Sequence, residues 1–135
     1  MSDCVFCSIV ARTAPAQIVD EDEHTISFMD INPATDGHAL VVPKRHAENI
    51  HEIDADDVAA VARSAKRLSD RIRTVLKPAG INLIQANGAA AFQTVFHFHM
   101  HVVPRYAGDA ITMPWIPTPG DPSAIADIAG RLRVE

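Results

Sequence analysis

The most constraining feature of this sequence is a run in which histidine alternates with apolar residues, FHFHMHVVPR at residues 96–105. Successive side chains of a β-strand point to opposite faces, so His97, His99 and His101 share one face of an extended segment. The apolar residues between them share the other face. We therefore predict a strand over 95–103 that packs its apolar side on a core and presents three histidines from the opposite side.

Three imidazoles on one face can act as nucleophile, acid, base or ligand. One alternative is an ordinary strand whose histidines have no chemical role, but strict alternation of three argues against it. Another is a three-histidine metal site. Same-face positions lie about 6.7 Å apart and the outer two about 13 Å, whereas zinc holds each nitrogen at about 2.0–2.1 Å. The spacing fits better a groove along an extended group such as a phosphate chain.

A phosphate also needs donors other than imidazole, and the segment before the histidines supplies them. Asn87-Gly88 and Gln93-Thr94 offer amides, a hydroxyl and backbone N–H groups on a loop rich in small residues. A plain connecting loop is the alternative interpretation.

The rest of the chain alternates between strand-like and helix-like stretches. Apolar residues recur at steps of three and four from Asp54 to Lys77, which predicts a long amphipathic helix with Asp54 as its N-terminal cap. Shorter patterns predict helices over 4–11 and 122–132 and strands over 17–20, 24–29, 38–43 and 80–87. Together these elements predict an antiparallel α+β fold.

Length and charge limit the class of protein. The 135 residues fit one domain, 1–135, with an irregular segment over 104–122 that holds five of the nine prolines. No apolar run approaches the ~20 residues of a membrane helix, and MSDCVFCSIV lacks the features of a secretory signal, so we expect a cytoplasmic protein. The net charge of −5 argues against a nucleic acid polymer as partner but not against a single nucleotide.

The histidine run resembles the signature of the histidine-triad (HIT) family, H-x-H-x-H with apolar residues between and after the histidines. Three further blocks are similar to the family: CVFCSIV at 4–10, SFMDINPATDGHALVVPKRH at 27–46 and NGAAAFQTVFH at 87–97. The likeness covers about 100 residues and is greatest to the short bacterial, Hint-like branch. It implies the HIT fold, a five-stranded antiparallel sheet with one long helix and short terminal helices, in which a homodimer extends the sheet.

The resemblance also implies a mechanism. His99 would attack the α-phosphorus of a purine nucleotide and form a nucleotidyl-histidine that water later hydrolyses. His101 would bind phosphoryl oxygens, and the backbone carbonyl of His97 would accept from the ring of His99. Asp30 would accept from the ribose hydroxyls, although a turn-forming role before Asn32-Pro33 is an equal alternative. The other implied binding residues enclose the base (Phe6, Ile9, Phe28 and Ile31) or line the sugar and phosphate path (His38, Asn87, Gln93 and Thr94). For the apolar ones, ordinary core packing is the alternative.

Cys4 and Cys7 form a C-x-x-C step, which indicates a metal knuckle or a redox pair. Zinc takes four ligands. Some HIT proteins with this pair complete a structural zinc site with two histidines that correspond here to His46 and His97, so the resemblance implies a Zn²⁺ site of Cys4, Cys7, His46 and His97. His51 is a competing ligand, five residues after His46.

The sequence leaves four candidate functions. The leading one is hydrolysis of nucleoside 5′-phosphoramidates or adenylylated amines, and its nearest rival is hydrolysis of dinucleoside polyphosphates. A zinc-stabilised nucleotide-binding module without turnover and a metallo-hydrolase that uses the triad as ligands are the others. Phe92 stands where the family usually has glycine, so the resemblance does not define the loop conformation or the leaving-group pocket at this position.

Overall fold

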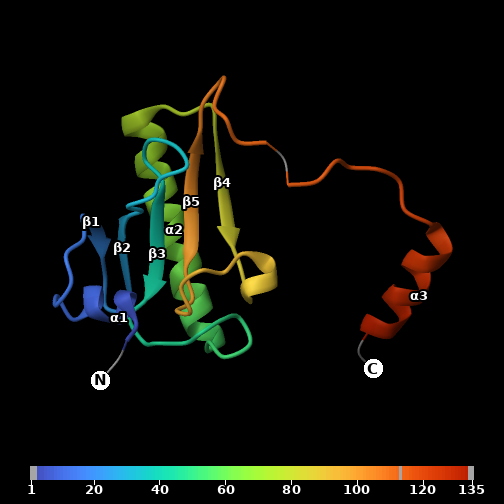
Figure 1. Ribbon diagram of the computed structural model, residues 1–135, viewed down its shortest axis with the longest axis horizontal. Coiled ribbons are helices and arrows are strands. Elements are labelled where there is room, and N and C mark those ends of the chain that lie inside the picture. Colours follow the sequence, from blue (N-terminus) through green and yellow to red (C-terminus); the bar gives the residue numbers. More distant parts are fainter. Residues whose placement is uncertain (1–2, 113, 134–135) are drawn as a thin grey trace.

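The computed structural model describes residues 3–112 and 114–133, and its centre is one five-stranded antiparallel sheet (Figure 1). The strands lie in the order β1-β2-β3-β5-β4. β4 and β5, which come after the long helix in the chain, pair with each other, and β5 also pairs with β3. The elements in chain order are α1 (Val5–Val10), β1 (Ile18–Glu21), β2 (Thr25–Met29), β3 (Ala39–Pro43), α2 (Ala55–Leu76), β4 (Gly80–Gln85), the 3₁₀ turn η1 (Ala89–Ala91), β5 (Met100–Arg105) and α3 (Pro122–Leu132). This is the predicted α+β architecture, and each predicted helix and strand exists.

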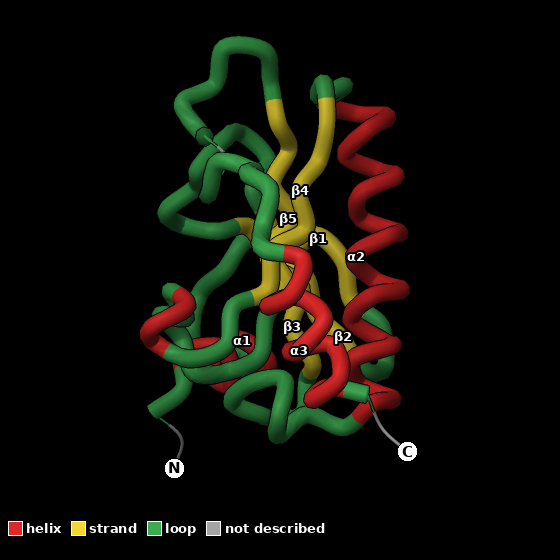
Figure 2. The backbone as a smooth tube through the Cα atoms, turned by 90° about the vertical axis from the view of Figure 1, so that its right-hand side faces the viewer, coloured by secondary structure: helices red, strands yellow, loops and turns green. Residues whose placement is uncertain are grey.

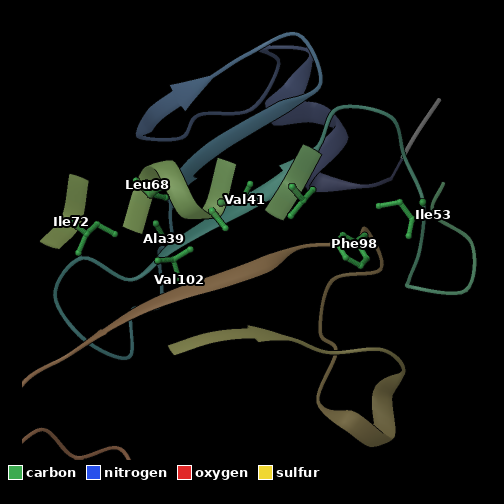
Figure 3. Packing of buried hydrophobic residues seen from close by; sticks show 10 residues of the cluster. Ala39, Val41, Ile53, Leu68, Ile72, Phe98 and Val102 are labelled. Carbon is green, nitrogen blue, oxygen red and sulfur yellow. The ribbon is translucent and has the colours of Figure 1, made fainter. Parts of the chain in front are cut away.

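The helix α2 covers one face of the sheet, as its apolar periodicity predicts. Its buried side chains include Val61, Ala65 and Leu68, which pack against sheet residues such as Val41 and Val102 (Figure 3). Lys77 ends the helix in the left-handed conformation. At the other end, Asp54 precedes the helix but its side chain makes no capping hydrogen bond, and its carboxylate instead accepts from Arg45. Only the capping prediction was therefore wrong at this helix.

The short helix α1 lies on the opposite face of the sheet from α2. Phe6 and Ile9 of α1 are buried against Ile26, Phe28 and Leu40 of β2 and β3. The sheet therefore separates two apolar layers, and the face with α1 is also the face of β5 that carries His101, because His101 pairs with Leu40 in register.

The histidine strand begins later than predicted. β5 starts at Met100, so His97 and His99 precede it and only His101 lies within the ladder. The reason is that β3 ends at Pro43 and its chain turns away, so the N–H of Phe98 donates to the carbonyl of Ala47 at 2.7 Å instead of to a straight neighbour. Phe98 is still buried on the α2 side.

A tight loop brings His38 to the start of β3. Gly37 has φ +92°, and a Cβ there would lie 2.5 Å from Cδ1 of Leu76 and 3.1 Å from Cγ of Pro104, so only glycine fits without displacement. The Thr35 hydroxyl donates to the carbonyl of Pro104, and the Tyr106 hydroxyl donates to that of Asp36, both at 2.6 Å. The end of β5 thus fixes the loop that carries His38.

The helix α3 stands apart from the sheet and from α1 and α2 (Figures 1 and 2). None of its described residues is buried. Among the described helices, none combines the length and apolar character that crossing a membrane requires.

Candidate active site and metal centre

A cavity of about 210 Å³ opens on the α1 face of the sheet, beside the histidines. Its apolar wall includes Phe6, Ile9 and Phe28. These side chains are almost fully buried, so they belong to the hydrophobic core and also line the cavity. Ile31 lines the cavity too but is 88% exposed, at its rim. The predicted residues that line the cavity are Phe6, Ile9, Phe28, Asp30, Ile31, Thr94, His99 and His101.

His99 has a defined tautomer in this cavity. Its Nδ1–H donates to the backbone carbonyl of His97 at 2.7 Å, which leaves the lone pair on Nε2. His99 is 4% exposed, and its ring and that of Phe6 lie nearly perpendicular at a centroid distance of 5.1 Å. Burial lowers the pKa of His99 and outweighs the hydrogen bond from the ring to the carbonyl of His97, which acts in the opposite direction. A neutral, oriented ring with a basic Nε2 is the form that a nucleophile requires.

His101 is oriented by a chain of hydrogen bonds from the Gly37 loop. The N–H of Ala34 donates to Nδ1 of His38 at 2.9 Å, so the neutral His38 ring carries its hydrogen on Nε2. That Nε2–H lies 2.9 Å from Nδ1 of His101 and donates to it. His101 must then carry its own hydrogen on Nε2. Burial, with smaller contributions from His99 and His38, lowers the pKa of His101 to about 4, which keeps this ring neutral.

Asp30 lies beside both of these rings. Its Oδ2 is 3.4 Å from Nε2 of His38 and 3.9 Å from Nδ1 of His101, while its Oδ1 accepts from the N–H of Asn32 at 2.8 Å. Asp30 therefore forms the turn and also lines the cavity.

Asp30, His38 and His101 also have the spacing of a metal site, but their hydrogen-bond chemistry opposes it. A metal at Nε2 of His38 would need the hydrogen on Nδ1, where the N–H of Ala34 already points. Two donors would then face each other at 2.9 Å. The arrangement thus favours a hydrogen-bonding role for these three side chains over a role as metal ligands.

Asn87 and Gln93 lie outside the residues that line the cavity and brace the loop before β5. Gln93 is buried, its Oε1 accepts from the N–H of Gly88 at 2.7 Å and its Nε2 donates to the carbonyl of Glu48 at 2.6 Å. The Oδ1 of Asn87 accepts from the N–H of Ile50 at 2.7 Å. These contacts hold the loop so that Thr94 reaches the cavity.

Phe92 lies at the C-terminal end of η1 in a conformation that glycine prefers. Its φ is +71° and its side chain is 88% exposed. Phe92 is therefore a bulky residue in the left-handed region, where a side chain strains the backbone.

A second cluster contains both cysteines. The Nδ1 of His97 lies 3.4 Å from Sγ of Cys4, 3.5 Å from Sγ of Cys7 and 3.1 Å from Nδ1 of His46. The Sγ of Cys7 lies 3.3 Å from Nδ1 of His46. All four ligand atoms lie within 4.8 Å of one another, so residues far apart in sequence converge on one point. His51, the competing ligand, is outside this cluster.

The donor set of this cluster fits zinc. Ligand atoms about 2.0–2.3 Å from a tetrahedral ion are roughly 3.3–3.8 Å apart, close to the observed separations. His97 is fully buried, and its Nε2–H donates to the carbonyl of Pro43 at 2.8 Å, which leaves the Nδ1 lone pair facing the cysteines. A ligating histidine normally donates its other N–H in this way. Burial, with a smaller contribution from His46, lowers the pKa of His97 to about 4, so the ring is in the neutral form that a metal needs.

Sequence reasoning missed two kinds of residue here. Backbone groups that set the tautomers, such as the N–H of Ala34 and the carbonyl of Pro43, leave no trace in residue type. The remaining lining residues are apolar residues with no chemical signal, namely Val5, Pro15, Ala16, Met29, Leu40 and Val95, together with the turn residue Asn32.

Comparison with known proteins agrees with this arrangement. A family model described as the HIT domain matches residues 11–108, which include the loop of His38 and all three alternating histidines. The chain belongs to the HIT family.

Two solved structures and one curated protein resemble the chain over most of its length. A Streptococcus mutans crystal structure superposes with a TM-score of 0.93 at 36% identity, covering 98% of this chain and 84% of that one. A crystal structure described as a Zn-bound histidine triad family protein from Mycobacterium smegmatis has a TM-score of 0.78 at 37% identity, covering 96% and 97%. The adenylylsulfatase HINT3 of Arabidopsis thaliana is 36% identical over 110 residues, 82% of this chain and 56% of that protein.

Proposed function

We propose that this HIT protein cleaves the bond between the α-phosphorus of a purine nucleotide and an amine, through a nucleotidyl intermediate on His99. One observation carries the proposal: His99 lines a cavity with apolar walls and a carboxylate, and its Nδ1–H donates to the carbonyl of His97, which leaves the lone pair on Nε2. An apolar slot suits a purine, and Asp30 suits the ribose hydroxyls.

In the proposed reaction, Nε2 of His99 forms a bond to phosphorus and the P–N bond to the amine breaks. The amine leaves with the electron pair and takes up one proton. Water then attacks the same phosphorus, the bond to Nε2 breaks, and the nucleoside monophosphate is released with one proton lost from the water. His101 donates its Nε2–H to a phosphoryl oxygen, where negative charge increases in the transition state.

The relationship to an adenylylsulfatase supports adenylyl as the transferred group. Hydrolysis of dinucleoside polyphosphates is the rival activity, because the same intermediate serves both. A binding module without turnover is the third candidate. The metallo-hydrolase that uses the triad as ligands is less favoured, because the ring of His97 faces Cys4 and Cys7 while His99 and His101 line the cavity.

We also propose that Cys4, Cys7, His46 and His97 hold a structural Zn²⁺, for which the cluster and the Zn-bound relative from M. smegmatis are the support. When bound, the ion links α1, the chain after β3 and the segment before β5. A cytoplasmic location is part of this proposal, because thiolates persist in a reducing compartment. We treat residues 1–135 as one HIT domain.

The test offers an adenosine phosphoramidate and a diadenosine polyphosphate in parallel to the wild type, His99→Ala and His51→Ala. His51 is exposed and outside both clusters, so it is the matched control. We expect His99→Ala to lose more than about a thousandfold in kcat/KM on the better substrate, and mass spectrometry of the quenched wild type to find adenylyl on His99. Equal rates for the wild type and His99→Ala would remove His99 from the mechanism. Tight AMP binding with no turnover of either substrate would favour the binding module.

A further inference from the structure

The helix α1 belongs to both the cysteine cluster and the cavity. Cys4 immediately precedes α1 and Cys7 lies within it, while Phe6 and Ile9 of the same helix line the cavity. Figure 2 shows α1 on the side of the sheet away from α2. An isolated helix shorter than about 12–15 residues is marginal in water, and α1 has 6. The position of α1 therefore depends on its contacts with the rest of the protein.

Phe6 connects the two sites most directly. It lies between the two cysteines in sequence, it is 7% exposed, and its ring centroid is 5.1 Å from that of His99. The Sγ atoms of Cys4 and Cys7 lie 3.4 and 3.5 Å from Nδ1 of His97. A shift of α1 that moved the cysteines away from His97 would therefore also move Phe6 away from His99.

The two sulfur atoms are placed so that an oxidant can join them. They lie within 4.8 Å of each other, and Sγ of Cys4 accepts from the N–H of Cys7 at 3.3 Å. A second cavity, of about 480 Å³, has Cys4 and His46 in its wall. Both cysteines are half-buried rather than enclosed. A molecule as small as hydrogen peroxide can therefore reach Sγ of Cys4.

Oxidation by a peroxide balances within this pair. The thiolate of Cys4 attacks one peroxide oxygen, the O–O bond breaks and hydroxide leaves, which produces a sulfenic acid. The thiolate of Cys7 then attacks that sulfur, forms the disulfide and expels a second hydroxide. The two sulfurs together lose two electrons, the peroxide gains them, and the two hydroxides take up two protons to become water.

A disulfide removes two of the four metal ligands and also a connection between elements. Its sulfurs are about 2.05 Å apart, whereas two thiolates on one tetrahedral zinc are about 3.8 Å apart. The remaining ligands, His46 and His97, complete only half of a zinc site. A bond between Cys4 and Cys7 is local to α1, so it does not replace the link that the metal makes to the chain after β3 and the segment before β5.

We propose that Cys4 and Cys7 form a redox switch for nucleotide binding: a peroxide converts them to a disulfide, the metal leaves, and α1 no longer holds Phe6 against His99. The inference rests on the proposed function for the occupant of the cavity, a purine nucleotide, and on the proposed zinc site, but not on the covalent step. The effect falls on affinity, because Phe6 is part of the apolar wall. A reductant and Zn²⁺ reverse it.

The test uses the full chain loaded with zinc, and AMP is the probe. Hydrogen peroxide should release one equivalent of zinc, measured with a chelating dye, and mass spectrometry of peptides should find a disulfide between Cys4 and Cys7. In calorimetry the Kd for AMP should rise at least about tenfold. Dithiothreitol with Zn²⁺ should restore the affinity. This reversal separates the switch from oxidation of methionine, whose sulfoxide needs a dedicated reductase.

Two matched variants test whether the effect passes through Phe6. Phe6→Leu should bind AMP more weakly in the reduced state and should lose most of the tenfold response, because the ring that oxidation displaces is absent. Phe96→Leu makes the same change at a side chain that is 47% exposed and outside the nucleotide cavity, so it should keep the full response. Equal responses of the two variants would overturn the path through Phe6.

Hydrogen exchange locates the change. The N–H of Ser8, which donates to the carbonyl of Cys4 at 3.1 Å, should exchange at least about tenfold faster after oxidation, while amides at the centre of α2 should not change. Unchanged exchange in α1, or retention of zinc alongside the disulfide, would contradict the switch. An oxidised protein that binds AMP as tightly as the reduced one would overturn the switch alone. A reduced protein that binds no AMP would overturn the proposed function, and the switch with it.

Discussion

The relay from His38 to His101 predicts that two similar substitutions have different effects. An asparagine at 38 places its Oδ1 near the position of Nδ1 and still accepts from the N–H of Ala34, but it loses the donor to His101. A glutamine places its amide nitrogen near Nε2 and keeps that donor. His38→Gln therefore preserves the tautomer of His101, while His38→Asn releases it.

The size of the difference follows from one hydrogen bond. A neutral hydrogen bond contributes about 0.5–1.5 kcal/mol net, and the upper half of that range applies because His38 is buried. We expect kcat/KM on an adenosine phosphoramidate to be about 5- to 13-fold lower for His38→Asn than for His38→Gln. Nitrogen-15 shifts of the imidazole report the tautomer of His101 directly. Equal losses in both variants, or an unchanged His101 tautomer in the asparagine variant, would refute the relay.

Three further predictions test other parts of the molecule. Cys7→Ser should lower bound zinc below half an equivalent and reduce the thermal midpoint, whereas His51→Ala should change neither; a full equivalent in Cys7→Ser, measured by atomic absorption, would contradict the proposed ligand set. Burial alone would raise the pKa of Asp22, but hydrogen bonds from two backbone N–H groups outweigh burial and lower the pKa to about 2. The ionised carboxylate therefore stabilises the folded protein fully above the unfolded pKa of 3.8, and this contribution is lost as the pH falls through 2. Asp22→Asn should consequently be less stable than wild type in urea at pH 7, with the gap closing toward pH 2; a constant gap would argue against the shift. Phe92→Gly relieves a left-handed residue whose side chain is exposed, so the free energy of unfolding measured in urea should stay equal or rise by about 0.5 kcal/mol, and a clear fall would mean that the Phe92 side chain packs on another part of the protein.

Local patterns predicted the elements well where one short stretch contains the whole signal. The long helix was expected over 54–77 and spans Ala55–Leu76, because both its periodicity and its Lys77-Pro78 stop are local. The start of β5 was misplaced because the partners of residues 97 and 98 are Pro43, at the end of β3, and Ala47, just after it, about 50 residues away in the chain. No local pattern contains that information.

The site shows the same division. The alternating histidines and the C-x-x-C step pointed to His99 and Cys7 from the sequence alone. The structure also brings together the two cysteines and two histidines that the family resemblance implies as zinc ligands. Sequence alone did not separate Thr94, which lines the cavity, from Gln93, whose amide braces the loop. Two adjacent polar residues in a loop can point their side chains in different directions, and contacts with distant parts of the chain determine those directions.

His97 takes part in two sites, with its ring in the cysteine cluster and its backbone carbonyl beside His99 at the cavity. Its ring faces the thiols, while its backbone carbonyl accepts a hydrogen bond from Nδ1–H of His99. Every amino acid supplies that oxygen, so replacement of the imidazole at position 97 removes a ligand without deleting the acceptor. Related chains that lack the metal should therefore be free to carry another side chain at this position. Such a replacement should leave the reaction at phosphorus intact wherever another cross-link keeps the backbone in place.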